Sequence, residues 1–305
     1  MRSTIWIQRV RGTHVQSGKF QFTKSEVMLH RIAALLPVLL GPATLAAEEL
    51  TKFEVETRKD IYYNTAKDAD PVRHKLDFYM PKRAKDYPMM MFVHGGAWKF
   101  GNKDEYKALG ENFAKQGIGV AVINYRLSSG KDPVKHPEHI KDVAKAFAWV
   151  KENCGKYGGN KDKLFISGHS AGGHLVALLA TDEKYLKAEG CSTRDICGVM
   201  AVSGVYTVTP FLLSDIFSKD EAVCKAASPM SHVKGGHPPF LIAYGNKDFM
   251  FLDALAEEFG KKLKDCKCEA QVMKLERDHY SIIINMASKS DDQLTKAMVE
   301  FMTKK

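Results

Sequence analysis

Short apolar runs that alternate with helix-forming stretches restrict the fold of this 305-residue chain more than any other feature of its sequence. Residues 89–93 are wholly apolar, as a strand buried on both faces requires. Residues 137–157 carry apolar side chains at helical spacing, among them Ile140, Val143 and Phe147. Because parallel neighbouring strands need long connections, usually helical, this alternation predicts an α/β fold with a mostly parallel sheet and helices on both faces.

The same reasoning assigns elements to most of the chain. Strands are expected at 53–63, 75–80, 89–93, 119–125, 163–167, 197–202, 240–244 and 268–275, and helices at 104–116, 137–157, 170–180, 252–263 and 291–302. The first two strands follow each other without a helix, so we expect them to form an antiparallel edge. The irregular stretch 204–239 contains four prolines and is expected to be a small insertion after the sixth expected strand, 197–202, with no large cap.

The formal net charge of +9 is concentrated near the N-terminus. Residues 1–46 carry six basic side chains against the single acid Glu26, while the other 39 basic and 35 acidic residues nearly balance. The charge therefore does not predict nucleic-acid binding. This asymmetry separates a leader, 1–46, from a single domain, 47–305, within which no linker or internal repeat marks a boundary.

The leader has the arrangement of a secretory signal peptide. The apolar run 32–40 follows His30-Arg31 and precedes the small-residue sequence Thr44-Leu45-Ala46. We expect a signal peptide at about 28–46, translation from Met28, and a secreted or periplasmic protein. A disordered basic arm on a cytosolic protein is the alternative.

The sequence also bears on membrane insertion, disulfide formation and metal binding. No run of eighteen apolar residues exists, so no transmembrane helix and no stable membrane insertion are expected. Six cysteines, an even number, allow disulfides in an exported chain, with their pairing undetermined. Cys266 and Cys268 have no second cysteine pair at zinc-site spacing, and His136 and His139 are better explained as solvated or core residues, so no metal site is expected.

The pentapeptide Gly168-His169-Ser170-Ala171-Gly172 lies between an expected strand, 163–167, and an expected helix, 170–180. A serine at such a turn projects from the sheet in a strained backbone conformation, and only very small residues two positions away avoid the neighbouring strand and helix. The helix also directs its N-terminus at the serine, where its dipole favours negative charge. Ser170 is therefore predicted to be a catalytic nucleophile.

A second glycine-rich segment, His94-Gly95-Gly96-Ala97-Trp98, follows the strand at 89–93. Glycines allow backbone N–H groups to turn toward a substrate oxygen. Together with the N–H of Ala171, those of Gly95 and Gly96 are predicted to form an oxyanion hole. We expect His94 to brace this loop by hydrogen bonding.

A serine nucleophile needs a base, and the base needs an acid that orients it. Asp248 and His279 each follow an expected strand, so both fall at the same edge of a parallel sheet as Ser170. In the predicted triad Ser170 attacks, His279 accepts and returns the proton, and Asp248 holds the imidazole. Asp253 and Asp278 are weaker candidates for the acid, because Asp253 lies within the following helix and Asp278 adjoins His279.

The substrate pocket is harder to assign from sequence. Trp98, His169, Tyr206 and Phe211 are its candidate lining residues, with packing in the core as the alternative for each. Tyr206 and Phe211 belong to the insertion at 204–239, which we expect to lie over the edge of the sheet that carries the triad.

Several segments together resemble the α/β-hydrolase superfamily, and more narrowly its bacterial carboxylesterase, feruloyl-esterase-like and arylformamidase-like branch. They are His94-Gly95-Gly96-Ala97-Trp98, Asn124-Tyr125-Arg126-Leu127, Gly168-His169-Ser170-Ala171-Gly172-Gly173-His174 and the pair Asp248 and His279. The resemblance covers about residue 53 to the C-terminus. It implies an eight-stranded sheet, a cofactor-free mechanism through an acyl-enzyme, carboxylic ester substrates and a supporting role for the second segment behind the oxyanion loop.

The sequence departs from hormone-sensitive-lipase-like relatives at two places. Ala97 stands where they usually carry a third glycine, and the strands expected within 48–87 leave no room for their N-terminal helical cap. A small lid favours an open pocket that takes short-chain or aryl esters.

The sequence is therefore interpreted as a serine carboxylesterase of small-molecule esters. An aryl-amide hydrolase of the formylkynurenine type would use the same residues and is the alternative within this class. A non-catalytic binding protein with the α/β-hydrolase fold is the alternative from another class. Such proteins usually lose a triad residue, whereas Ser170, Asp248 and His279 are all present here.

Overall fold

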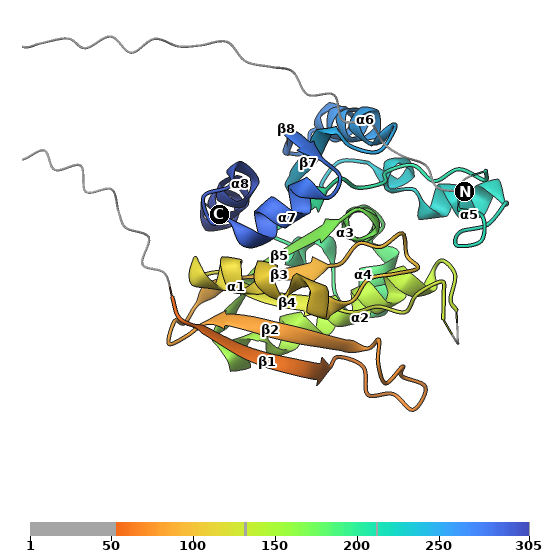
Figure 1. Ribbon diagram of the computed structural model, residues 1–305. Helices are drawn as coiled ribbons and strands as arrows, with labels where there is room; N and C mark the ends of the chain where they lie inside the picture. Colours follow the sequence, from red (N-terminus) through yellow and green to blue (C-terminus); the bar gives the residue numbers. More distant parts are fainter. Residues whose placement is uncertain (1–52, 131–132, 212, 305) are drawn as a thin grey trace, which may run out of the picture. The chain divides into compact units, whose positions relative to one another are not determined.

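An eight-stranded sheet runs through residues 53–130, 133–211 and 213–304, the part of the chain that the computed structural model describes (Figure 1). The strands are β1 (Val55–Tyr62), β2 (Lys75–Pro81), β3 (Tyr87–Val93), β4 (Gly119–Ile123), β5 (Gly159–His169), β6 (Gly198–Val202), β7 (Phe240–Lys247) and β8 (Ala270–Asp278). Their order across the sheet is β1-β2-β4-β3-β5-β6-β7-β8. The expected leader and signal peptide lie outside the described residues.

The strand directions match the expected topology. β2 pairs antiparallel with both β1 and β4, and every other neighbouring pair is parallel. The mostly parallel sheet and its antiparallel edge are thereby confirmed. β4 and β6 bury all of their residues, whereas β1, at the edge, exposes most of its own. Strands covered on both faces need continuous apolar sequence, which is why the central strands could be recognised.

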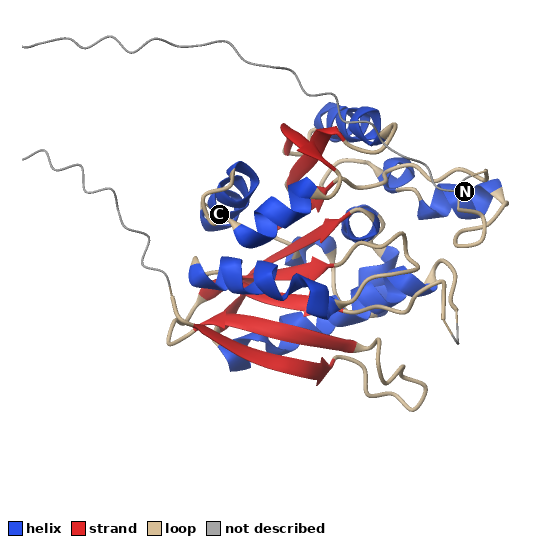
Figure 2. Cartoon of the chain, in the orientation of Figure 1, coloured by secondary structure: helices blue, strands red, loops and turns tan. Residues whose placement is uncertain are grey.

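Helices cover both faces of the sheet (Figure 2). Successive residues of β3 alternate between two hydrophobic clusters, with Met89 and Met91 in one and Met90 and Phe92 in the other. The first cluster includes residues of α2 (Glu138–Asn153), α3 (Ala171–Thr181), α4 (Lys184–Ala188) and α6 (Leu252–Asp265). The second includes residues of α1 (Lys107–Lys115), α7 (Ser281–Ser288) and α8 (Gln293–Thr303). Each face of the sheet therefore has its own core.

The helix that follows the predicted nucleophile is buried along its whole length. All eleven residues of α3 are buried, which is consistent with their apolar character on every side of the helix. α3 packs between the sheet and the insertion that joins β6 to β7, which contains α5 (Glu221–Ala227). The Nε2–H of His174 donates to the carbonyl of Ala227 at 2.8 Å, so a polar contact fixes the insertion to α3.

Two features, disulfides and a helix that could span a membrane, are absent from the described residues. No disulfide joins the six cysteines, all of which lie in the described part of the chain, so the disulfides that the sequence allowed are not formed. Within the same ranges, no helix is both long enough and apolar enough to cross a bilayer.

A buried ion-pair cluster fixes the segment before α1 to the neighbouring strands. The Lys103 ammonium lies 2.8 Å from Asp77 Oδ1 and 2.9 Å from Asp60 Oδ1, and the lysine side chain is 3% exposed. The backbone N–H of Lys103 donates to Asn124 Oδ1 at 2.7 Å. Because the Asp77 side chain is fully buried, removing the lysine would leave an uncompensated charge away from water.

Lys103→Met is expected to lower the free energy of unfolding by about 3–5 kcal/mol, the cost of removing one partner of a buried pair. Lys107→Met is the matched control, because Lys107 is exposed and its ammonium lies 3.6 Å from Glu111 on the helix surface. We expect the control to lose less than about 1 kcal/mol. Urea unfolding followed by circular dichroism measures both, and equal losses would contradict a structural role for the Lys103 cluster.

Candidate active site

Ser170 occupies the turn between β5 and α3 in a strained conformation. Its backbone has φ 56° and ψ −117°, and its N–H donates to the carbonyl of Val202 at 2.9 Å. The turn is tight: a Cβ on Gly168 would lie 2.4 Å from the carbonyl carbon of Gly172, and one on Gly172 would lie 2.0 Å from Val93 O. Only glycine fits at these two positions, which is the steric reason for the motif.

Asp248 and His279 meet at the carboxyl ends of the adjacent parallel strands β7 and β8. The His279 Nδ1 lies 2.6 Å from Asp248 Oδ1, and the two side chains are 5% and 1% exposed, respectively. Because Nδ1 faces the carboxylate, Nε2 is the nitrogen left to face a reactant. The pairing that the sequence predicted between these residues is present in the structure.

The Asp248 carboxylate has further donors that sequence reasoning missed. Ser203 Oγ donates to Oδ2 at 2.5 Å, and the backbone N–H of Phe249 donates to Oδ1 at 2.8 Å. Burial raises the pKa of Asp248, but the hydrogen bonds from His279 and Ser203 outweigh it and hold the net pKa below the usual range. Ser203 immediately follows β6, so its place at the carboxyl end of a parallel strand was the available signal.

Ser170 and His279 line one cavity of about 420 Å³. Within the described structure the side chains of Ser170 and His279 make no direct hydrogen bond with each other. In enzymes of this kind the hydrogen bond between nucleophile and base often forms only when substrate binds. Four aromatic side chains also line this cavity, namely Phe100, Tyr106, Phe249 and Tyr280. The Phe249 ring stacks on the His279 imidazole, with centroids 4.1 Å apart, so it covers one face of the histidine.

The loop after β3 presents backbone N–H groups to this cavity. Gly96, Ala97 and Trp98 all have positive φ, and both Gly96 and Ala97 line the cavity. Among the described residues, the N–H groups of Gly96, Ala97 and Ala171 have no hydrogen-bond acceptor. The N–H of Gly95, in contrast, donates to the Tyr106 hydroxyl at 3.2 Å. The expectation that Gly95 directs its N–H at the substrate is thereby corrected, because a side chain already accepts that N–H.

Hydrogen bonds from neighbouring segments brace the same loop. The Tyr125 hydroxyl donates to the carbonyl of His94 at 3.2 Å, and Arg73 Nη2 donates to the carbonyl of Gly101 at 3.0 Å. Arg126, the next residue of the motif, pairs with the buried Asp142, which also lies 3.1 Å from His74 Nε2. The contacts of Tyr125 and Arg73 occupy carbonyl groups of the loop and leave the N–H groups of Gly96 and Ala97 available.

Of the four predicted pocket residues, only His169 lines the cavity. Trp98 is 2% exposed and packs edge-on against His174 and Phe217, because the left-handed backbone at the end of the loop turns its ring into the core. Tyr206 is fully buried and stacks on Phe259, with ring centroids 4.3 Å apart.

Phe211 is 94% exposed and does not line the cavity either. The pocket walls come instead from residues that directly follow the acid and the histidine, Phe249 and Tyr280, and from the segment that contains Phe100 and Tyr106. The adjacency of Phe249 and Tyr280 to Asp248 and His279 in the sequence was the signal that could have found them.

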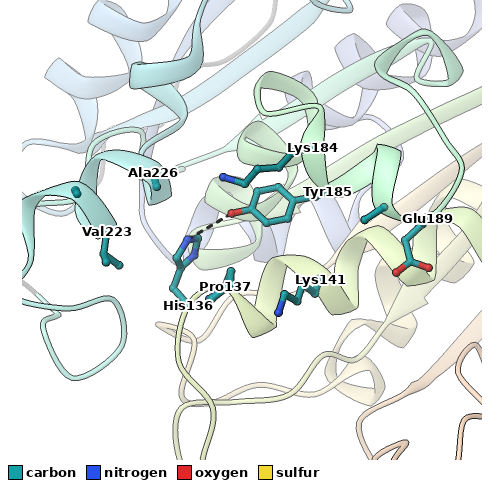
Figure 3. Close-up of a pocket in the computed structure, with 10 residues that line it drawn as sticks. His136, Pro137, Lys141, Lys184, Tyr185, Glu189, Val223 and Ala226 are labelled. Carbon is teal, nitrogen blue, oxygen red and sulfur yellow. Dashed lines mark hydrogen bonds between the residues drawn. The ribbon is translucent and has the colours of Figure 1, made fainter.

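The insertion lines a different cavity. This larger, mostly apolar cavity of about 600 Å³ lies among the start of α2, α4 and α5 (Figure 3), and none of its lining residues belongs to the predicted triad. His136 points at the Tyr185 hydroxyl, 3.4 Å away, and Lys184 lies beside the same ring (Figure 3). The insertion therefore does not cover the site around Ser170, contrary to expectation.

Among the described residues, no group of three His, Cys, Asp or Glu side chains is arranged to hold a metal ion. The groups around Ser170 are instead a hydrogen-bonded acid and imidazole, a hydroxyl in a strained turn, and backbone N–H donors. This arrangement can carry out nucleophilic acyl transfer.

The strand order, together with a strained serine after β5, an acid after β7 and a histidine after β8, defines an α/β-hydrolase fold. A truncated carbohydrate esterase from gut microbiota superposes with a TM-score of 0.69 at 22% identity, covering 84% of this chain and 97% of that one. Esterase B from Lactobacillus rhamnosis superposes with a TM-score of 0.67 at 21% identity, covering 82% and 85%. At these identities the likeness shows the fold.

The chain belongs to the BD-FAE family, whose sequence profile matches residues 76–263, more than half of its length. Esterase LipQ of Mycobacterium tuberculosis is 34% identical over 197 residues, which are 58% of this chain and 46% of LipQ. Kynurenine formamidase of Danio rerio is 26% identical over 273 residues, which are 86% of this chain and 87% of that protein. The chain spans about half the length of the mycobacterial esterases it matches.

Ser203→Ala is expected to lower kcat/KM about tenfold, because it removes a hydrogen bond to the charged carboxylate that orients His279. Ser167→Ala is the matched control, since the Ser167 hydroxyl is also buried, within the parallel strand β5, but donates to the carbonyl of Met200. The control should keep kcat/KM within about twofold. An unchanged kcat/KM in Ser203→Ala would remove Ser203 from the site.

Stability is expected to fall as the pH is lowered from 7 to 5. Burial lowers the pKa of His169 and His174 to about 3 and that of His94 to about 4, below the value of about 6.5 expected in the unfolded chain. The unfolded chain therefore binds more protons below about pH 6.5, and the stabilisation present above that pH is lost as the pH falls. At pH 5 the loss is at most about 2 kcal/mol per histidine.

Thermal unfolding at several pH values and constant ionic strength measures this dependence. His174→Gln keeps a side-chain N–H that can donate to Ala227 O but cannot titrate, so its Tm should depend less on pH. A wild-type Tm that stays constant between pH 7 and 5 would show that these histidines are not held neutral by burial.

Proposed function

We propose that this protein is a serine carboxylesterase that hydrolyses short-chain or aryl carboxylic esters through an acyl-enzyme intermediate. The observation that carries the proposal is the Asp248–His279 pair, 2.6 Å between Oδ1 and Nδ1, which shares a cavity with the strained Ser170. The esterase names of relatives such as LipQ support the reaction class.

In the proposed reaction Ser170 Oγ attacks the ester carbonyl carbon while His279 Nε2 accepts the hydroxyl proton. The low pKa of Asp248 keeps its carboxylate ionised beside the imidazolium that forms. His279 then protonates the leaving alcohol, which departs as the acyl–oxygen bond breaks. Water repeats the sequence on the acyl-enzyme, with His279 as base, and releases the acid and the free serine.

The negative charge on the carbonyl oxygen needs donors during both steps. We assign this role to the N–H groups of Gly96, Ala97 and Ala171, which lack acceptors among the described residues. Ala171 is the first residue of α3, so the helix dipole adds to its effect. Preorganised donors of this kind are each worth roughly 2.7–4 kcal/mol in comparable enzymes.

The cavity favours substrates with a small acyl or an aryl group. Its aromatic walls, Phe100, Phe249 and Tyr280, offer faces on which a ring or a short alkyl chain can pack. The insertion lines another cavity and leaves this one open. An open, short pocket does not provide the long apolar tunnel that a fatty acyl chain would fill.

An aryl-amide hydrolase is the second candidate. The similarity to kynurenine formamidase of Danio rerio extends over 86% of this chain and 87% of that protein, a more complete match than that to the mycobacterial esterases. Acyl transfer from an amide would use the same serine, histidine and N–H donors.

Hydrolysis of p-nitrophenyl acetate, butyrate, octanoate and palmitate, methyl ferulate and N-formylkynurenine is the direct test. We expect kcat/KM to be highest for the acetate, the butyrate or the ferulate and to fall steeply beyond butyrate. Ser170→Ala should lower kcat by at least about 10⁴-fold on every substrate that is turned over. A preference for N-formylkynurenine would replace the esterase proposal by the amide-hydrolase one.

The acid is tested by a matched pair of variants. Asp248→Asn should lower kcat by about 10⁴-fold, because an amide cannot hold the imidazole in the required tautomer. Asp253→Asn should stay within about twofold of wild type, since Asp253 is exposed and its Oδ1 accepts from Ala254 N in the first turn of α6. The reverse ranking would assign the acid to Asp253.

A further inference from the structure

Tyr106 lines the cavity of Ser170, and its hydroxyl has no chemical role in the reaction as described so far. Tyr106 ends the short 3₁₀ helix Lys103–Tyr106, and its half-buried ring packs against Phe92, with centroids 5.0 Å apart, and against His94, at 6.3 Å. Packing on two rings from β3 and its loop fixes the direction of the phenol. The hydroxyl is thus held in one place before substrate arrives.

The hydrogen bond from Gly95 leaves the Tyr106 proton available. A phenolic oxygen both accepts and donates, and here it accepts the N–H of Gly95 at 3.2 Å. Among the described residues no acceptor for the Tyr106 O–H is present, and Tyr106 lines a cavity of about 420 Å³. The O–H proton is therefore free to be donated to a bound molecule.

The position of Gly95 places this proton near the reacting atoms. A Cβ on Gly95 would lie 3.4 Å from the Cβ of Ser170, so Gly95 and the nucleophile are in contact. The Tyr106 oxygen is one hydrogen bond away from that glycine, and all three residues line the same cavity. An ester carbonyl attacked by Ser170 has its oxygen in this region.

We propose that the Tyr106 hydroxyl donates a hydrogen bond to the substrate carbonyl oxygen as it becomes an oxyanion, in place of the Gly95 N–H that it engages. This proposal rests on the acyl-transfer function proposed above. No bond to hydrogen is broken at Tyr106: the proton stays on the phenol, and the hydrogen bond strengthens as negative charge develops on the carbonyl oxygen.

Two physical effects suit the hydroxyl to this role. Accepting the N–H of Gly95 polarises the phenol, and hydrogen bonds in such a chain strengthen one another, so the O–H becomes a better donor. Burial raises the pKa of Tyr106, more than the hydrogen bond from Gly95 lowers it, so the phenol keeps its proton at neutral pH. The donor is therefore present whenever His279 can act as a base.

Tyr106→Phe is expected to lower kcat/KM for p-nitrophenyl acetate by about 100-fold, mainly in kcat, the effect of removing one oxyanion donor. Tyr185→Phe is the matched control, because it removes a tyrosine hydroxyl from the other cavity, away from Ser170. That control should keep kcat/KM within about threefold of wild type.

A second measurement separates donation to the oxyanion from bracing of the loop. Sulfur is a poor hydrogen-bond acceptor, so replacing the carbonyl oxygen of the ester by sulfur weakens the contribution of any oxyanion donor. The wild type and Tyr185→Phe should therefore prefer the oxygen ester over its thionoester by a large, similar factor. Tyr106→Phe should reduce that factor by about tenfold or more.

The outcomes distinguish the alternatives. Tyr106→Phe with kcat/KM within threefold of wild type would refute the proposal, as would an equal loss on ester and thionoester with a lower Tm, the result expected of a loop brace. A wild-type protein that hydrolyses no ester or amide of the panel would refute the proposed function, and this role of Tyr106 with it.

Discussion

The first turn of α3 approaches the end of β3 so closely that no side chain fits between them. A Cβ on Gly172 would lie 2.0 Å from Val93 O, and one on Gly168 would meet the carbonyl carbon of Gly172 at 2.4 Å. Ser170 lies two residues before Gly172, and the oxyanion loop starts one residue after Val93. This single backbone contact therefore sets the distance between Ser170 and the N–H groups of the loop, and the left-handed φ of 56° at Ser170 is the strain that the contact imposes.

The protein stabilises its buried polar groups in two different ways. Asp248 and Lys103 stay charged because each has several close partners: His279, Ser203 and backbone N–H groups for the acid, and acidic side chains for the lysine. His169 and His174 stay neutral instead, because burial lowers their pKa values. Charge is thus kept where it orients a catalytic group or fixes a loop, and is absent where it would only add the cost of desolvation.

The insertion between β6 and β7 contributes no residue to the cavity that Ser170 lines. Phe217 packs against Trp98 and His136, and Ala227 accepts a hydrogen bond from His174, so this segment stays on the far side of Trp98 and lines the second cavity. The walls around Ser170 are left to short segments next to the catalytic residues. In the proposed reaction, the residues that contact the substrate are therefore close in sequence to the residues of the triad, and substituting one kind without disturbing the other is difficult.

Local patterns in the sequence determined the strands, most helices, their parallel arrangement and the places of Ser170, Asp248 and His279. They could do so because burial on both faces demands apolar runs, a tight turn demands glycine, and the carboxyl ends of parallel strands meet at one edge. Only the tertiary structure decided that Ser203 holds Asp248 and that Tyr106 accepts the N–H of Gly95.

The tertiary structure also placed Trp98, Tyr206 and Phe211 away from the cavity and brought Phe249 and Tyr280 into it. These positions depend on where side chains point in loops with left-handed residues, such as Ala97 and Trp98, and on contacts between segments far apart in the chain. No local pattern encodes such directions, because each is fixed by the packing of the whole domain around it.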